Sequence, residues 1–317
     1  MHAAGRLGLY AMGLVIAFVG AYGISAAVVP AGVVADGTEA ARDGGAAMSG
    51  HAAMTDGSQD ASLPGVSLSA DGYALSAVAS PASTDEPGEL AFRILTTGGE
   101  PLTDFAVSHE KRLHLIVVRG DGALFRHVHP TLDTTTGTWS LPWQWDEAGT
   151  YRVYADFTPG DGTAEGVVLT RTVHIAGELA PVRAEPTRSA IVDDFALSIT
   201  GDLTAGTASE LTVSISRGNE PVTELEPYLG AFGHLVALRD GDLAYLHVHP
   251  QGEDPQPGGT SGPDVSFMVE APTTGRYLLY FDFQVDGQVR TAAFVVDAES
   301  GQRSTPTGHG DEAPHGH

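Results

Sequence analysis

Six histidines form two copies of one pattern, His-x12-His-x-His-Pro. The first copy holds His114, His127 and His129, and the second holds His234, His247 and His249. Neutral imidazole nitrogens bind Cu(II), Zn(II) or Ni(II), and such an ion needs three or four ligands at about 2 Å. The sequence contains no cysteine, which excludes thiolates both as metal ligands and as nucleophiles. Each triple is therefore predicted to bind a transition metal, copper as the first expectation and zinc as the second.

The first two histidines of each copy are predicted to lie on the two strands of a β-hairpin. Strand-like residues flank turns at residues 119–122 and 240–241, which are rich in Gly and Asp. A turn at residues 119–122 places His114 directly across from His127, with Cβ atoms about 5 Å apart. His129 follows two residues later on the same face. The same count in the second copy makes three imidazoles converge there as well.

Four further residues complete the predicted sites. Pro130 and Pro250 end the strand beyond the last histidine of each copy, which leaves the cluster at the sheet edge with an open coordination position. Asp156 and Asp282 lie on the strand expected beside the first histidine, where a carboxylate can orient an imidazole by accepting its other N–H. The alternative is structural, because half-buried histidines on strands commonly hydrogen-bond to carbonyls or carboxylates.

The histidine patterns lie within a long internal repeat. Residues 71–76 recur as residues 193–198, and residues 149–157 recur as residues 275–283. The repeat predicts two domains, at residues 65–177 and 178–297. The first is expected to contain seven strands, at residues 73–79, 89–95, 113–118, 123–129, 138–145, 150–157 and 166–175. This spacing predicts an all-β chain of two tandem immunoglobulin-like Greek-key β-sandwiches, with a cupredoxin-like barrel as the neighbouring alternative.

The N-terminal residues 1–29 predict a membrane segment. Residues 7–29 are uncharged and mostly apolar, which is the length that a helix needs to cross a bilayer. Arg6 precedes the run and the far side becomes acidic, so the bulk of the chain is expected outside the cytoplasm. A single-pass protein of the cell membrane is favoured, or a secreted protein if a signal peptidase cuts at the small residues 25–27.

Two segments without apolar periodicity are expected to be disordered: a linker at residues 30–64 and a tail at residues 298–317. Both contain residues suited to metal capture, which are Met48, His51 and Met54 in the linker, and His309, His315 and His317 in the tail. Two thioethers with an imidazole favour Cu(I). Forty acidic residues against sixteen basic ones give a net charge of -24, which would repel nucleic acid.

The motifs resemble those of exported actinobacterial proteins with paired His-x-His-Pro motifs, which are associated with heavy metals and copper. The resemblance is carried by residues 127–130, 247–250 and 233–235, and by the strand at residues 151–157. It implies an extracytoplasmic compartment and a metal as ligand. The proposed fold is also distantly similar to that of immunoglobulin-like periplasmic copper carriers, whose Met-rich site inside the domain is missing here.

These observations predict a binding protein that sequesters or delivers copper or zinc, with a membrane transporter or another metal-handling protein as a possible partner. The alternative is a structural or adhesion-type tandem β-sandwich protein whose histidines form hydrogen-bond networks. We expect no enzyme activity, because the sequence contains no serine nucleophile motif and no phosphate-binding glycine loop.

Overall fold

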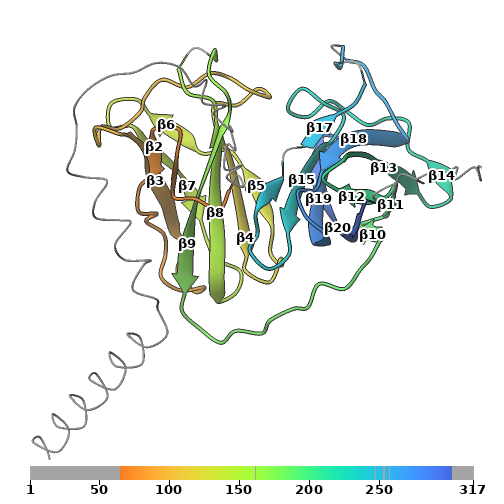
Figure 1. The fold of residues 1–317 in the computed structure, drawn as a ribbon, viewed down its shortest axis with the longest axis horizontal. Coiled ribbons are helices and arrows are strands. Elements are labelled where there is room, and N and C mark those ends of the chain that lie inside the picture. Colours follow the sequence, from red (N-terminus) through yellow and green to blue (C-terminus); the bar gives the residue numbers. More distant parts are fainter. Residues whose placement is uncertain (1–64, 161, 247, 253, 257, 302–317) are drawn as a thin grey trace, which may run out of the picture. The chain divides into compact units, whose positions relative to one another are not determined.

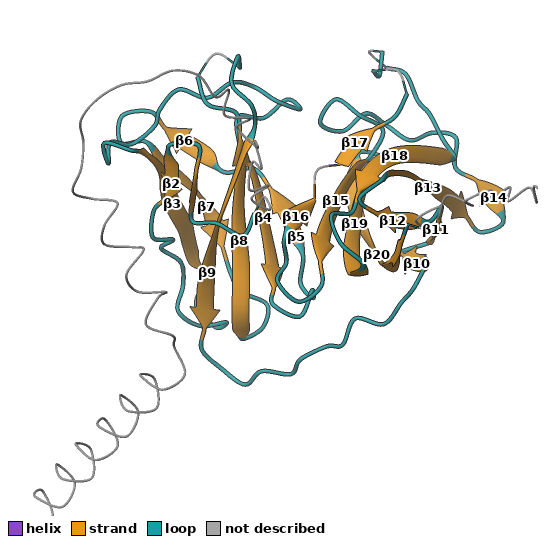
Figure 2. Ribbon diagram, in the orientation of Figure 1, coloured by secondary structure: helices purple, strands orange, loops and turns teal. Residues whose placement is uncertain are grey.

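The computed structural model describes residues 65–160, 162–246, 248–252, 254–256 and 258–301. All regular elements of this part are β-strands, as Figure 2 shows. The predicted membrane segment, the linker and the tail from residue 302 onward lie outside it, and with them the six Met and His residues predicted to capture metal. Among the described residues no helix has the length and apolar character to span a membrane.

The first repeat is a sandwich of two sheets (Figure 1). One sheet has the order β1-β2-β3-β7-β6 and the other has the order β5-β4-β8-β9. The strands are β1 (Ser69–Ala70), β2 (Tyr73–Leu75), β3 (Gly88–Thr96), β4 (His114–Arg119), β5 (Arg126–Val128), β6 (Thr131–Asp133), β7 (Thr138–Trp143), β8 (Gly149–Phe157) and β9 (Val167–Ile175). The seven predicted strands are present, with β1 and β6 in addition.

The second repeat has the same architecture. One sheet has the order β10-β11-β13-β18-β17, with β14 paired to β13, and the other has the order β12-β20-β19-β15-β16. The strands are β10 (Ser189–Val192), β11 (Phe195–Thr200), β12 (Leu203–Ala205), β13 (Ala208–Arg217), β14 (Glu220–Pro221), β15 (His234–Arg239), β16 (Tyr245–Leu246), β17 (Val248–Pro250), β18 (Asp264–Glu270), β19 (Gly275–Val285) and β20 (Gln288–Ser300). β20 continues past residue 297, where the second domain was predicted to end.

The strand orders confirm the immunoglobulin-like prediction. β2-β3-β7-β6 corresponds to the A-B-E-D sheet of an immunoglobulin domain, and β4-β8-β9 corresponds to its C-F-G sheet. Each repeat also has the tyrosine corner that is common in these domains. The hydroxyl of Tyr151 donates to the carbonyl of Glu147 at 2.7 Å, and that of Tyr277 donates to the carbonyl of Thr273 at 2.8 Å.

Each sandwich has its own apolar core between its sheets. In β11 the side chains of Phe195, Leu197 and Ile199 are buried while their neighbours are exposed, which is the alternation of a strand with one buried face. β4 differs, because all six of its residues are buried. A strand buried on both faces must have a second partner.

That partner is the other repeat. A third apolar cluster joins the outer face of β4 and β8 to that of β15 and β19, and it comprises Ile116, Val118, Tyr154, Val236, Leu238, Leu243, Leu278 and Tyr280. Reciprocal hydrogen bonds flank it: Tyr154 donates to the carbonyl of Leu243 at 2.6 Å, and Tyr280 donates to the carbonyl of Gly122 at 2.5 Å. The two repeats therefore form one packed unit.

A substitution at Gly122 tests the packing between the two repeats. It has a φ of 82°, and an added Cβ would lie 2.5 Å from a methyl carbon of Leu278 in the other repeat. We expect Gly122→Ala to destabilise the protein by about 1–3 kcal/mol more than Gly241→Ala in urea unfolding. Gly241 is a matched control because its φ is 102° and no atom lies within 4 Å of the added Cβ. Equal losses would mean that the inter-repeat contact adds nothing.

Candidate metal site

The first histidine triple is placed by the hairpin of β4 and β5. The strand register pairs His127 with Ile116, so the prediction that His127 lies directly across from His114 is wrong by two residues. The turn is centred one residue later than predicted, with Leu124 in the left-handed region at a φ of 56°. Moving a turn by one residue changes each pairing by two, and the histidines therefore stay on the predicted face.

The three imidazoles converge. His114 Nδ1 lies 3.0 Å from His127 Nε2 and 3.2 Å from His129 Nε2. One nitrogen from each ring can be chosen such that all three lie within 4.8 Å of one another. Nitrogens that share an ion at about 2 Å must lie at comparable separations. The predicted convergence of His114, His127 and His129 is therefore confirmed, while the presence of a metal stays a proposal.

The outward nitrogens of two rings are held by oxygen acceptors. His114 Nε2 lies 3.1 Å from the carbonyl of Ser108, and His127 Nδ1 lies 2.8 Å from Oδ2 of Asp282. A neutral imidazole has one N–H, and here each of these N–H groups points to an oxygen that can only accept. The inward nitrogens, His114 Nδ1 and His127 Nε2, then both present lone pairs. Two lone pairs at this distance repel one another unless a cation lies between them.

Burial favours the neutral form of two imidazoles of the triple. It is the largest cause that lowers the pKa of His114 from 6.5 to about 3, and the neighbouring His127 is the second cause. Burial is also the largest cause that lowers the pKa of His129 to about 3, followed by His127 and His114. A metal binds the unprotonated nitrogen, so a low pKa reduces competition from protons at neutral pH.

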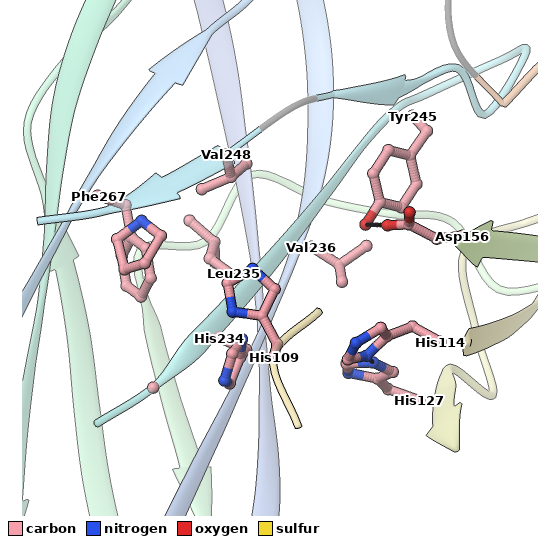
Figure 3. A pocket seen from close by; sticks show the side chains of 12 residues that line it. His109, His114, His127, Asp156, His234, Leu235, Val236, Tyr245, Val248 and Phe267 are labelled. Atoms are coloured by element: carbon pink, nitrogen blue, oxygen red, sulfur yellow. Dashed lines mark hydrogen bonds between the residues drawn. The ribbon is translucent and has the colours of Figure 1, made fainter. Parts of the chain in front are cut away.

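The two predicted carboxylates behave differently from one another. Asp156 pairs with His114, and Asp282 pairs with His234, as the sequence predicted. However, Asp282 accepts from His127 of the other repeat, which the sequence did not predict. The carboxylate of Asp156 instead accepts from the hydroxyl of Tyr245 at 3.3 Å (Figure 3), and burial raises its pKa to about 6.

The second triple is described only in part. His234 repeats the environment of His114, because its Nε2 lies 2.8 Å from the carbonyl of Tyr228, the counterpart of Ser108. Burial lowers the pKa of His234 to about 4. His247 lies outside the described residues, as does the side chain of His249. Convergence of this triple stays a prediction.

His109 was left out of the predicted site because the second copy has no histidine at its position. It lies on a turn at a φ of 47°, exposed, with its ring 6.1 Å from that of His114 and 5.5 Å from that of His234. These three histidines and His127 line a pocket of about 100 Å³ (Figure 3). The second copy has Leu229 at the corresponding turn, so a search for repeated histidines could not find His109. The signal that the sequence offered was its position four residues before the predicted strand at residues 113–118.

The lowered pKa values predict how pH affects the metal-free protein. Unfolding returns His114 and His129 to a pKa near 6.5, so the unfolded chain binds protons that the folded chain does not. The free energy of unfolding should therefore fall as the pH drops below 6.5 toward about 3, by up to about 1.4 kcal/mol per pH unit for each histidine. Urea unfolding with a chelator measures this slope. The slope should decrease in His129→Gln, and an unchanged slope would contradict the prediction.

The fold and the site define a tandem immunoglobulin-like protein with a histidine cluster beside the contact between its repeats. A family model described as a domain of unknown function (DUF8832) matches residues 68–175 and again residues 190–300. The chain therefore belongs to this family and contains its domain twice. A comparison with curated proteins found no match.

Several solved structures match the chain at low sequence identity and low TM-score. The Escherichia coli adhesin FdeC is 13% identical, over 74% of this chain and 66% of that one, with a TM-score of 0.22. The bacterial integrin-binding protein invasin is 14% identical, over 72% and 39%, with a TM-score of 0.21. Salmonella alpha-2-macroglobulin is 16% identical, over 74% and 15%, with a TM-score of 0.24. The chain thus spans only part of each of these proteins, and the fold assignment rests on its own strand order.

Proposed function

We propose that this protein is a binding protein, not an enzyme, and that it holds a transition-metal ion through His114, His127 and His129. Copper is the first candidate and zinc the second, because three imidazole nitrogens without thiolates suit either ion. The ion would be sequestered or delivered outside the cytoplasm, in keeping with the apolar N-terminal segment and with the resemblance to exported copper-associated proteins. A membrane transporter or another metal-handling protein would be the partner.

One observation carries this proposal: the inward lone pairs of the triple. The carbonyl of Ser108 and the carboxylate of Asp282 orient His114 and His127 so that their unprotonated nitrogens face one point, and His129 Nε2 reaches the same point. Histidine ligands of metals usually donate their other N–H in this way. The arrangement supplies three nitrogens and leaves a coordination position free for exchange.

Titration of the whole chain with Zn(II) and with Cu(II) tests the proposal. Replacing His114, His127 and His129 together by alanine should remove one binding event, seen as a lower stoichiometry in isothermal titration calorimetry. Replacing His234, His247 and His249 should remove a second one if that triple also converges. Binding by the N-terminal linker and the C-terminal tail is common to all variants and cancels in the comparison. Unchanged stoichiometry and affinity in the first variant would refute the proposal.

A structural role is the second candidate, and the same contacts favour it in a different protonation state. If His127 carries two protons, its Nε2–H can donate to His114 Nδ1 at 3.0 Å while Asp282 balances the charge. The network would then be closed without an ion, as in a tandem β-sandwich protein of structural or adhesion type. In that case the triple-alanine variant would lose stability, but added metal would not stabilise the natural protein.

A further inference from the structure

We infer that the first metal site is assembled from both repeats: Asp282 of the second repeat is the positioning residue for His127, and ion binding and repeat docking therefore stabilise one another. This inference rests on the proposed function and adds to it a link between the ion and the arrangement of the two repeats.

Asp282 is well placed for this role. It lies on β19, which is held between β15 and β20, and only 2% of the residue is exposed. One carboxylate oxygen accepts from His127 at 2.8 Å, and the other accepts from the hydroxyl of Thr291 at 2.5 Å. The side chains of His127 and Asp282 are 6% and 3% exposed, so water competes little for their hydrogen bond. Both oxygens of the carboxylate are thus fixed by named donors.

The contact sets the chemical form of His127. A carboxylate that accepts the Nδ1–H fixes the tautomer, holds the ring plane and increases the basicity of Nε2, the nitrogen that faces the other two imidazoles. Loss of such a partner typically weakens metal affinity by about 10–100-fold. No residue of the first repeat makes this contact with Nδ1 in the described part of the chain.

The contact exists only when the repeats are docked. His127 pairs with Ile116, which belongs to the apolar cluster between the repeats. Asp282 lies on β19 in the other repeat, and its carboxylate accepts from His127. If the repeats separate, His127 loses its acceptor. An ion that binds the docked form more tightly by some factor must stabilise docking by the same factor.

The pseudo-equivalent residue provides a matched control. Asp156 occupies the same position on β8 that Asp282 occupies on β19, since each pairs with the first histidine of its own triple. It also bears a carboxylate and is partly buried, but its hydrogen-bond donor is the hydroxyl of Tyr245, and it acts on His127 as a nearby charge. Asp156→Asn therefore changes the charge at the same interface without removing the acceptor of His127.

The experiment measures Zn(II) affinity of the whole chain by competition with a chromophoric chelator. We use a background in which His234, His247 and His249 are alanine, so that only the first triple is observed. Asp282→Asn should weaken binding by about 10–100-fold, and Asp156→Asn should change it by less than about threefold. Nitrogen-15 NMR of the metal-free protein should show a fixed Nδ1–H tautomer of His127, which is lost in Asp282→Asn and retained in Asp156→Asn.

Hydrogen exchange provides the second readout. Zn(II) should slow exchange of the amides of β4 and β15 in the background protein, and this protection should disappear in Asp282→Asn. If the background protein binds Zn(II) but Asp282→Asn binds it equally well, the inference is wrong and the proposed function stands. If the background protein, in which only the first triple is intact, binds no metal, the proposed function fails. Should Asp282→Asn not fold, the tautomer of His127 in the metal-free background protein decides: a proton on Nδ1 supports the inference, and a proton on Nε2 overturns it.

Discussion

Replacing His127 by glutamine should lower the affinity of the first repeat for Zn(II) or Cu(II) by more than about 100-fold. His127 contributes the nitrogen closest to His114, at 3.0 Å, and it is the ring that Asp282 orients. Removing a ligand should exceed the effect of removing the group that orients one, which is about 10–100-fold. Competition with a chelator of known affinity measures the loss of affinity. Nitrogen hyperfine structure in the electron paramagnetic resonance spectrum of the Cu(II)-bound protein should report one imidazole ligand fewer.

His109→Gln is the control for this result. The residue lies in the same pocket and carries the same ring, but it is exposed, and its contacts with His114 and His234 are between rings at 6.1 and 5.5 Å. We expect its affinity to stay within about threefold of the natural protein, because it is not one of the three converging ligands. Equal losses in the two variants would show that the bound ion is held elsewhere in the pocket.

Leu238→Ala should destabilise the protein by about 2–5 kcal/mol, the usual range for truncating a buried leucine. Leu238 is fully buried on β15, yet it packs in the cluster between the repeats and not in the core of its own sandwich. The lost stability therefore reflects weaker packing between the two repeats. Urea unfolding of the metal-free chain measures it, and Zn(II) should restore part of the stability if the ion prefers the docked form.

Ile191→Ala provides the comparison for Leu238→Ala. Ile191→Ala truncates a side chain of similar size on β10. Ile191 is 81% exposed, so this substitution should change the free energy of unfolding by no more than about 0.5 kcal/mol. If Leu238→Ala were as mild as this control, the contact between the repeats would contribute little. The linkage between ion and docking would then have no energetic basis.

The sequence alone determined the parts of the structure that local patterns encode. The internal repeat predicted two domains, and Gly- and Asp-rich turns between short apolar runs predicted the strands of an immunoglobulin-like sandwich. The period of two residues along a strand placed His127 and His129 on one face with His114, and this face is kept because the observed register differs from the predicted one by two residues. The tyrosine corners are local in the same sense, because Tyr151 and Tyr277 each bond to a carbonyl four residues earlier in the chain.

The tertiary structure decided the contacts between residues that are distant in sequence. His127 and Asp282 are 155 residues apart, and no turn or strand period relates them. The sequence predicted that Asp282 would serve its own repeat, because the neighbouring strand of the same sheet was the only partner that pairing rules could name. Docking of the two repeats brought another sheet closer to His127. It also buried both faces of β4 and placed His109 beside His234 of the second repeat, since packing between surfaces depends on three-dimensional shape that local periodicity does not contain.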